Sequence, residues 1–461
     1  MKKIFFLFVL SLTLVFYTDC SNNVSSENTT YDSSKPSSIL SMEPDSGGYG
    51  DEVIFTGENL GRDTSQIKIF FNHKLAKVIS SDGTHALAFV PKLPGNDCKI
   101  KLVMGKDSKD TSICKSDFSY IKKYQLTYIA GELGSTSSTT TTGTLTQTSF
   151  ANLEFLSCDS AGGLYINCEG AQNSAMVYLN EEQGFTKLIG NGQSYSNAGS
   201  TMAPFIDRST GMVYYCGQNH GWVYIVDPSN GFNVQLKKLN VPNENYIAAG
   251  YRPLPSGTMP DDFFSWLYNY AGPGDGWLYS LTYAGGFYRF KPNERVYDII
   301  STRVRYFNVD NYILADPYDK TKIYCSLLQK NIIACIDLTK DPSDPDFETL
   351  VCGQENSAGY QDGHISIAKL NRPRQIVITK DEETGDKIMY IADSGNHCIR
   401  KFDMNTKMVT TIAGNPEKSG YSTGSPEKSL MNEPFGLCLT PDGDLYISDR
   451  GNSIILKLQF L

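Results

Sequence analysis

Histidine is the residue type in this sequence that could bind a transition metal or act as a base near neutral pH. After residue 121 the chain contains three histidines, His220, His364 and His397. A zinc site needs three or four ligands brought together in space. The separations of 144 and 33 residues between these histidines match no repeat in the chain, so no centre built from equivalent histidines is predicted. His220 and His364 remain candidates for a ligand or a base, and His397 is predicted to lie in a turn.

Aromatic side chains are a second chemical feature. All three tryptophans fall between residues 222 and 277, together with several tyrosines. An aromatic ring presents an apolar face on which the C–H face of a sugar can stack, while nearby polar groups bind the hydroxyls. The predicted ligand-binding residues are Trp222, Trp266, Tyr268, Tyr270, Trp277 and Tyr283. The alternative is that these rings pack inside the fold, as large aromatic residues commonly do.

Composition limits the fold and the partners. The 461 residues include 40 Gly, 28 Tyr and 23 Phe, and turn-forming glycines with aromatic strand formers favour an all-β fold. The formal net charge is −9, so the chain lacks the positive field that binding to a phosphate backbone requires. Nucleic acid is therefore not predicted as a partner.

The first 38 residues are predicted to direct export. Lys2 and Lys3 precede an apolar stretch, residues 4–16, which has the length of a signal-peptide core and is shorter than the ~20 residues of a membrane-spanning helix. The stretch ends shortly before Cys20, and this arrangement resembles the lipobox of bacterial lipoproteins, in which the cysteine is lipidated. We predict a signal peptide at residues 1–19, lipidation at Cys20, and a flexible Ser/Asn-rich tether at residues 20–38. The alternative is ordinary secretion with an unmodified Cys20.

Residues 39–121 are predicted to form a small β-sandwich. Short alternating runs such as residues 53–55, 67–71, 86–90 and 99–103 are separated by turn residues. The opening segment, residues 44–60, has glycines that suit the tight turn before the first strand and the bend after it. It resembles the IPT/TIG immunoglobulin-like family, and the resemblance implies a spacer or an interaction module.

The rest of the chain, residues 122–461, contains a repeat. A tyrosine that follows an apolar residue and a turn recurs at intervals of 45 to 66 residues, at Tyr165, Tyr214, Tyr279, Tyr324, Tyr390 and Tyr446. Four-stranded blades have periods of ~40–50 residues plus loop insertions, so the six units predict a six-bladed β-propeller. Residues 127–131 match the blade-ending phrase at residues 411–414, whereas the last unit stops after its third strand. Residues 124–131 are therefore predicted to close the ring.

The last two units share a longer phrase. Residues 371–373 and 393–396, and then residues 432–434 and 449–452, repeat Asn-x-Pro followed by Asp-x-Gly-Asn. The phrase resembles the NHL repeat, and the four earlier units are degenerate copies. Gly and Asn tolerate positive φ, and Asp side chains can accept hydrogen bonds from nearby backbone N–H groups. A tight turn therefore explains Asp393 and Asp449 without a ligand.

The whole arrangement resembles lipoproteins of Bacteroides-like bacteria, many of which serve surface glycan capture and uptake. The resemblance implies an outer-membrane lipoprotein at the cell surface, held by its lipid anchor alone. It also implies non-catalytic binding of an extracellular glycan or surface protein through the loops of the propeller, with an outer-membrane uptake complex as a further partner. No cofactor is predicted for this function.

The alternative function is a metal-dependent hydrolase or lyase with its site on the propeller axis. Some NHL propellers are lyases with an axial zinc ion, and other six-bladed propellers are hydrolases with an axial calcium ion. Oxygen-bearing side chains that could approach such an axis are Glu169, Asn219, Asp316 and Asp393, although no motif assigns them. A divalent cation on the axis belongs to this alternative.

Ten cysteines remain beside Cys20. Export permits disulfides, and the pairs that hairpins or a shared domain bring nearest are Cys158/Cys168, Cys325/Cys335 and Cys98/Cys114. We favour the interpretation that most of these cysteines are buried thiols on strands.

Overall fold

The computed structural model describes residues 30–92, 95, 97–169, 175–189, 203–207, 210–216, 222–238, 257–258, 272, 277–281, 286–291, 296–301, 304–305, 311–381 and 384–460. The predicted signal peptide and Cys20 lie outside these residues. The chain divides into two compact units, Met1–Tyr120 and Ile121–Leu461. None of the helical segments in the described residues has the length and hydropathy of a membrane span.

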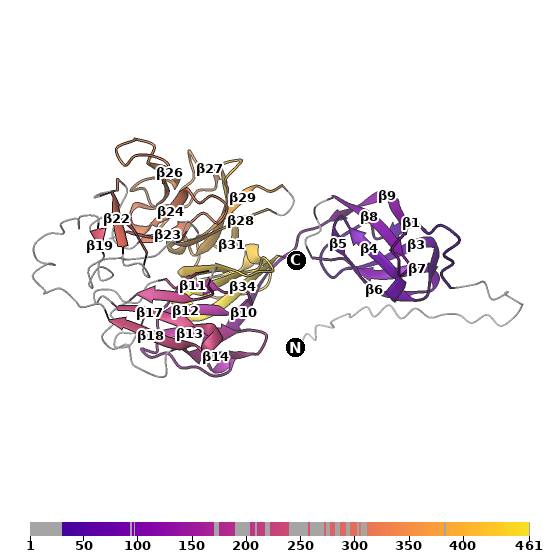
Figure 1. Ribbon diagram of the computed structural model, residues 1–461, viewed down its shortest axis with the longest axis horizontal. Helices are drawn as coiled ribbons and strands as arrows, with labels where there is room; N and C mark the ends of the chain where they lie inside the picture. Colours follow the sequence, from indigo (N-terminus) through magenta and orange to yellow (C-terminus); the bar gives the residue numbers. More distant parts are fainter. Residues whose placement is uncertain are drawn as a thin grey trace, which may run out of the picture. The chain divides into compact units, whose positions relative to one another are not determined.

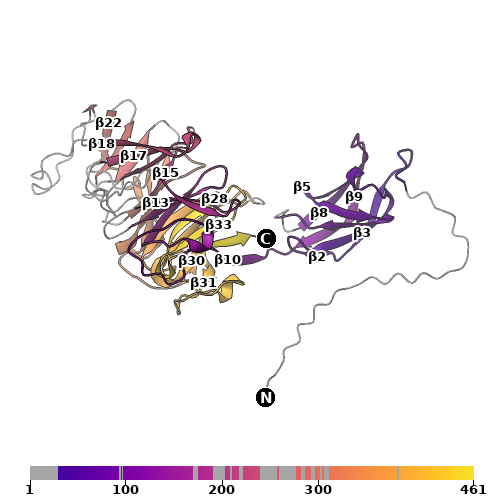
Figure 2. The same cartoon turned by 90° about the horizontal axis from the view of Figure 1, so that it is seen from below.

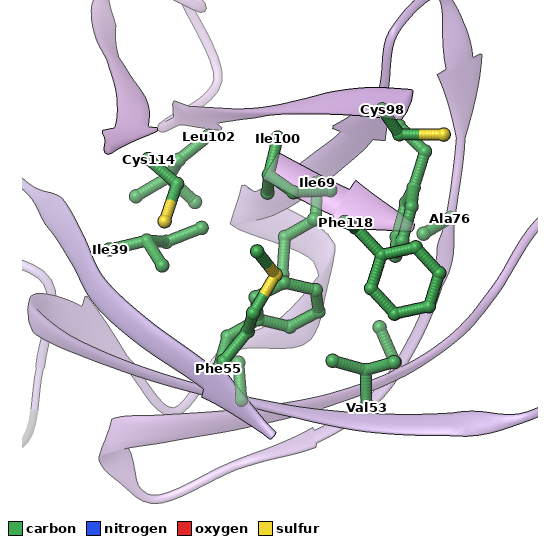
Figure 3. Close-up of a cluster of buried hydrophobic side chains, with 14 of the residues drawn as sticks. Ile39, Val53, Phe55, Ile69, Ala76, Cys98, Ile100, Leu102, Cys114 and Phe118 are labelled. Carbon is green, nitrogen blue, oxygen red and sulfur yellow. The ribbon is translucent and has the colours of Figure 1, made fainter. Parts of the chain in front are cut away.

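The first unit is a β-sandwich whose sheets have the strand orders β1-β3-β7-β6 and β2-β9-β8-β4-β5. Its strands are β1 (Ser38–Glu43), β2 (Ser46–Gly47), β3 (Glu52–Gly61), β4 (Ile67–Phe71), β5 (Lys74–Leu75), β6 (Lys77–Ser81), β7 (Gly83–Phe89), β8 (Asp97–Met104) and β9 (Asp110–Tyr120). Alternating residues of facing strands form the core, in which Phe71 meets Phe55 and Phe118 edge to face. Figure 3 shows Cys98 and Cys114 at opposite ends of this core, and the two are not joined by a disulfide bond.

Residues 30–37, which fall within the predicted tether, lie against the sandwich. Tyr31 packs against the hydrophobic core, and its hydroxyl donates to Asp110 at 3.4 Å. The backbone N–H of Ser37 also donates to Asp110, at 3.1 Å. The ordered sandwich therefore begins before its first strand.

In the residues that the structure describes, the strands of the second unit form six antiparallel sheets, which we number as blades 1 to 6 in chain order. Figure 1 shows this unit. Blade 1 contains β11 (Leu153–Cys158), β12 (Leu164–Cys168), β13 (Ala175–Asn180) and β14 (Phe185–Leu188), and blade 2 contains β15 (Phe205–Ile206), β16 (Val213–Cys216), β17 (Trp222–Asp227) and β18 (Asn233–Lys238). Blade 3 contains β19 (Gly257–Thr258), β20 (Leu278–Leu281), β21 (Phe287–Lys291) and β22 (Val296–Ser301), and blade 4 contains β23 (Asn311–Ala315), β24 (Lys322–Leu327), β25 (Ile332–Asp337) and β26 (Glu348–Gly353). Blade 5 contains β27 (Gly363–His364), β28 (Pro373–Lys380), β29 (Lys387–Asp393), β30 (Cys398–Asp403) and β31 (Met408–Gly414), and blade 6 contains β10 (Tyr124–Ala130), β32 (Pro434–Leu439), β33 (Leu445–Asp449) and β34 (Ile454–Phe460).

The ring closes where the sequence predicts. Strand β10 pairs antiparallel with β34, from Tyr124 opposite Phe460 to Ala130 opposite Ile455, so the start of the propeller supplies the outer strand of the last blade (Figure 2). Gly131 follows β10 with φ of 109°, and a Cβ atom there would lie 2.5 Å from the carbonyl oxygen of Ser453. The all-β, six-bladed prediction and its closing segment are confirmed.

The turns that follow β29 in blade 5 and β33 in blade 6 are each built on a buried aspartate. Asp393 accepts hydrogen bonds from the backbone N–H of Asn371 at 2.8 Å and from the side chain of Asn396 at 2.8 Å. Asp449 makes the same two contacts in blade 6, to Asn432 at 2.7 Å and Asn452 at 2.6 Å. The hydrogen bonds of each aspartate thereby connect the turn to the loop that precedes the innermost strand of the same blade. The role of these aspartates is structural.

Blade 5 adds a buried cation to this turn. Arg400 is fully buried and donates to Asp393 at 2.7 Å and to Asp362 at 2.6 Å. It also donates to the backbone carbonyls of Lys369 and Gln361, at 3.0 and 2.9 Å. At the matching position of blade 6 the chain has Leu456, so Arg400 secures the loop into blade 5 specifically.

One disulfide joins the two ends of the ring. Cys158 of blade 1 and Cys438 of blade 6 are bonded, with their Cα atoms 6.0 Å apart. Among the residues described, seven cysteines are buried thiols outside any disulfide, namely Cys98, Cys114, Cys168, Cys325, Cys335, Cys352 and Cys398. The hairpin pairs Cys158/Cys168 and Cys325/Cys335 therefore do not form, and the interpretation of most cysteines as buried thiols is correct.

Candidate functional site

The innermost strands of blades 1, 5 and 6 each contain a β-bulge close to their first residue. We call the end of the propeller at which these strands begin the loop face. A β-bulge interrupts the pairing between Leu153 and Leu156, between Pro373 and Ile376, and between Pro434 and Leu437. The residue before each strand has positive φ: Asn152, Arg372 and Glu433. A bulge adds one residue and redirects side chains. It gives blades 1, 5 and 6 two consecutive residues at the bulge, namely Glu154–Phe155, Arg374–Gln375 and Phe435–Gly436.

Gln375 shows that these bulges meet on the propeller axis. Its side-chain oxygen accepts from the backbone N–H of Leu156 at 2.9 Å and of Leu437 at 3.1 Å. Its side-chain nitrogen donates to the Leu156 carbonyl at 2.7 Å and to the Tyr312 hydroxyl at 3.2 Å. One buried amide of blade 5 thus binds blades 1, 4 and 6. Gly436 permits the close approach, because a Cβ atom there would lie 2.3 Å from the Glu154 carbonyl oxygen.

Around Gln375 lies a set of rings and cations that we call the axial cluster: Phe155, Tyr312, Arg374, Phe435 and Arg450. Phe155 stacks on Tyr312 with ring centroids 5.6 Å apart and meets Phe435 edge to face at 5.0 Å. The guanidinium groups of Arg374 and Arg450 lie 4.3 and 5.2 Å from the centroid of Phe435. Four blades therefore contribute to one cluster of aromatic and cationic groups at the loop face.

Glu154 lies beside this cluster as a buried carboxyl group. It accepts from the Asn167 side chain at 3.3 Å and lies 4.0 Å from Arg450. Burial, and then the nearby charge of Glu169, raise the pKa of Glu154 to about 8, although Arg450 and Arg374 act in the opposite direction. Glu154 therefore retains its proton to a higher pH than an exposed glutamate does.

The raised pKa of Glu154 predicts a pH-dependent stability. The group binds its proton more tightly in the folded state, so its contribution is fully present below about pH 4.5 and is lost as the pH rises through about 8. Because glutamine stays neutral, Glu154→Gln is expected to flatten the fall in stability between pH 5 and 9. Denaturant midpoints at pH 5, 7 and 9 measure this, with Glu433→Gln as control because the Glu433 side chain is 41% exposed. Equal pH slopes for the parent and Glu154→Gln would contradict the assignment.

A divalent cation does not fit the described part of this site. Two guanidinium groups lie within 5.2 Å of one ring centroid, and their positive charges would repel a divalent cation bound beside them. The neighbouring Glu154 is a poor ligand while it is protonated. In the described residues no three His, Cys, Asp or Glu side chains form a metal-binding group.

The sequence-predicted aromatic residues fall mostly outside the described side chains. Trp266, Tyr268, Tyr270 and Tyr283 lie outside the described residues, and Trp222 is described only as backbone in β17. Trp277 is half-buried, packs against the core shared by blades 3 and 4, and has the Arg289 guanidinium 4.5 Å from its ring centroid. Its ring is thus in part a packing element, and the six residues stay a prediction.

The predicted polar candidates are dispersed. His364 is exposed and lies in β27, which pairs with the last strand of blade 5 and not with its innermost strand, so it lies apart from the axial cluster. His397 has φ of 53° and caps the turn after Asp393, as predicted. Asp316 is buried and pairs with Lys387 at 2.6 Å at the far end of β23 from Tyr312. His220 and Asn219 lie outside the described residues. Of the candidates that the structure describes, Glu169 lies next to the axial cluster, beside Glu154.

A Gly-x-Ser-x-Gly sequence lies in a loop of the propeller. Residues 420–424 read Gly-Tyr-Ser-Thr-Gly, the pattern of a hydrolase nucleophile elbow, in which the serine sits between a strand and a helix. Here Ser422 lies in the loop between blades 5 and 6, and its hydroxyl donates to the Lys428 carbonyl at 3.3 Å. The required elbow is not formed.

Comparisons with known proteins agree with this architecture. Residues 36–120 match the model of the IPT/TIG domain. A segment of 95 residues is 38% identical to NHL repeat-containing protein 2 of Homo sapiens and covers 20% of this chain and 12% of that protein. The chain spans only 9% to 13% of the length of the curated relatives it matches.

Two solved structures extend the likeness to almost the whole chain. A structural genomics protein of unknown function from Bacteroides thetaiotaomicron VPI-5482 has a TM-score of 0.67 at 19% identity, covering 94% of this chain and 100% of the other. An auxiliary nutrient binding protein from Bacteroides ovatus ATCC 8483 has a TM-score of 0.61 at 20% identity, with the same coverage of 94% and 100%. At such identities the likeness concerns the fold. The chain thus combines an IPT/TIG domain with an NHL-type β-propeller.

Proposed function

We propose that this protein is a non-catalytic binding protein that captures an extracellular glycan at the loop face of its propeller, with the axial cluster as a contact surface. The observation that carries the proposal is the anchoring of Tyr312 and its neighbours by one buried amide across four blades. Rings held in place before binding lose little entropy when a ligand stacks on them. Aromatic faces beside hydrogen-bonding groups are suited to sugars.

The fold likeness supports the same proposal. The Bacteroides ovatus protein of similar fold is named an auxiliary nutrient binding protein, and capture of a nutrient requires recognition without turnover. Export, lipidation at Cys20, a cell-surface position and delivery to an uptake complex complete the proposal. In this scheme the IPT/TIG domain is a spacer, and a surface protein is the other ligand class to test.

A glycan array on the mature chain, followed by calorimetry, tests the proposal. Tyr312→Ala is expected to weaken binding of a recognised glycan at least tenfold, which corresponds to about 1.4 kcal/mol. Tyr318→Ala is the matched control, because Tyr318 is 46% exposed and follows the other end of the same strand. Trp222→Ala, Trp266→Ala and Trp277→Ala test the sequence-predicted platform in the same assay. The glycan mass should be unchanged after incubation.

Two results would contradict the proposal. One is the absence of binding to any glycan on the array. The other is cleavage of the bound glycan, which would favour an enzyme. If Tyr312→Ala binds like the parent while one tryptophan variant does not, the ligand contacts blades 2 and 3 and the axial cluster is not the contact surface.

A further inference from the structure

Successive blades are joined by a hydrogen bond from the loop that enters one blade to a turn of the blade before it. Asn331 of blade 4 has φ of 59°, and its side-chain oxygen accepts from the backbone N–H of Arg372 at 2.9 Å. His397 of blade 5 has φ of 53°, and its ring nitrogen Nδ1 accepts from the backbone N–H of Glu433 at 3.1 Å. Arg372 and Glu433 each precede the innermost strand of their blade. The two contacts are therefore equivalent in place, but one acceptor is an amide oxygen and the other an imidazole nitrogen.

The acceptor nitrogen of His397 can take up a proton. A ring nitrogen that accepts a hydrogen bond carries no hydrogen, so the contact with Glu433 requires a neutral imidazole whose proton is on Nε2. Histidine is the side chain whose charge ordinarily changes between about pH 5 and 8. In the protonated ring both nitrogens are donors, and Nδ1 then faces the Glu433 N–H without being able to accept from it. The amide of Asn331 takes up no proton in this range, so the contact with Arg372 persists.

The Glu433 contact lies in the segment that carries Phe435 of the axial cluster. Backbone N–H groups along residues 432–437 donate to side chains: Asn432 to Asp449 at 2.7 Å, Gly436 to Ser448 at 2.6 Å and Leu437 to Gln375 at 3.1 Å, in addition to Glu433. Glu433 has φ of 52°, a backbone conformation that costs free energy in a residue other than glycine. The contact with His397 helps to hold this conformation, and its loss acts two residues before the Phe435 ring.

The charged side chains next to the contact form two pairs. Glu433 carries its own carboxylate, which lies 3.9 Å from Arg372, and both side chains are about half exposed. Asp393 begins the turn that ends at His397, and it is paired with Arg400 at 2.7 Å inside blade 5. Both carboxylates therefore have a guanidinium partner other than His397.

Asp449 is a second titratable acceptor of the same segment. Its two oxygens accept from the backbone N–H of Asn432 and from the side chain of Asn452, so a proton on either oxygen would face a donor. Burial raises the pKa of Asp449 to about 7, although the hydrogen bonds from Asn452 and Asn432 act in the opposite direction. Acid therefore weakens the contact at Asn432 as well as the contact at Glu433. A test of His397 needs a variant that leaves Asp449 in place.

We propose that His397 is a proton-sensitive positioning residue of the axial cluster. The neutral ring holds the loop that enters blade 6, and with it Phe435, and protonation of the ring releases this loop. The loop that enters blade 5 is its acid-resistant counterpart, because Asn331 supplies the acceptor there. The inference concerns the free protein and goes beyond the proposed function, since it requires no bound ligand.

Hydrogen exchange resolved to single amides tests the inference on the mature protein at pH 8 and pH 5. The measured quantity is the protection factor, which is the intrinsic exchange rate at each pH divided by the observed rate. We expect the protection factor of the Glu433 amide to fall at least about threefold at pH 5, as loss of one hydrogen bond implies. The Arg372 amide in the same sample should keep its protection factor. The Gly436 amide, which donates to Ser448, should lose protection with Glu433 if the release reaches the bulge.

His397→Asn is the matched variant, because Asn331 already fills the equivalent place with an amide oxygen at positive φ. This variant should remove most of the pH dependence at Glu433 and leave that of the Asn432 amide, which Asp449 accepts. His364→Asn is the control: it removes an exposed histidine whose Nδ1 contacts the Ser366 hydroxyl, and it should behave like the parent.

Three results would overturn the inference or part of it. An unchanged Glu433 amide in the parent, or the same change in His397→Asn as in the parent, overturns the role of His397. A change at Glu433 with none at Gly436 overturns the link to Phe435. Should His397→Asn not fold, equal changes at Glu433 and Arg372 in the parent overturn the inference. Because no glycan is present, failure here leaves the proposed function standing, and absence of glycan binding on the array leaves this inference standing.

Discussion

An Arg400→Ala variant is expected to lose about 3–5 kcal/mol of the free energy of unfolding of the propeller. Arg400 is fully buried, and so is the Asp393 carboxylate that it binds at 2.7 Å. Burial raises the pKa of Asp393 to about 6, so this group is ionised at neutral pH. Removal of the guanidinium leaves a buried charge without its cation. Chemical denaturation of the full chain measures the loss.

A further pair of variants separates the effect of losing the Arg400 charge from the effect of losing its side-chain volume. Arg400→Met combined with Asp393→Asn removes both charges, and it should be more stable than Arg400→Met alone, since a neutral buried pair carries a smaller desolvation cost. Asp362→Ala should cost less than about 1 kcal/mol, because the Asp362 side chain is 38% exposed. A loss under 1 kcal/mol for Arg400→Ala would contradict the account of the blade 5 turn.

Removal of the Cys158–Cys438 disulfide is expected to cost about 2–5 kcal/mol. The bond joins residues 280 positions apart and links blade 1 to blade 6, so it limits the unfolded chain more than a hairpin disulfide would. Denaturation of the Cys158→Ser/Cys438→Ser variant measures the effect. Its sheets should still form, because β10 and β34 close the ring independently.

The control for this variant is Cys335→Ala, which removes a buried free thiol of blade 4 and reports the cost of lost packing alone. Peptide mapping under non-reducing conditions should recover Cys158 and Cys438 in one cross-linked product. Recovery of both as free thiols, or a double variant as stable as the parent, would contradict the assignment.

The sequence predicts the closure of the ring because the relevant signals are local. The phrase at residues 127–131 matches a blade-ending strand, and each repeated tyrosine lies on a strand whose partners are its sequence neighbours. Antiparallel blades are built from consecutive hairpins, so periodicity and turn residues are sufficient. The disulfide has no such signal: Cys158 and Cys438 become neighbours only when the first and last blades meet.

The axial cluster could not be predicted from the sequence for a related reason. Its members occupy matching places in different blades but are different residue types, so no repeat marks them. Only the Asn-x-Pro sequence at residues 371–373 and 432–434 indicates the bulges that follow. The charge state of Glu154 depends on burial and on Glu169, and neither can be read along the chain. The fold was therefore predictable, whereas the axial cluster was not.

A crystal structure of the mature protein with its bound glycan tests the central claim most directly. The account predicts an intact ligand at the loop face, with a sugar ring against Tyr312 and polar contacts to Arg374 or Arg450. A ligand bound on the sandwich, or at the opposite end of the propeller near Tyr318, would contradict it.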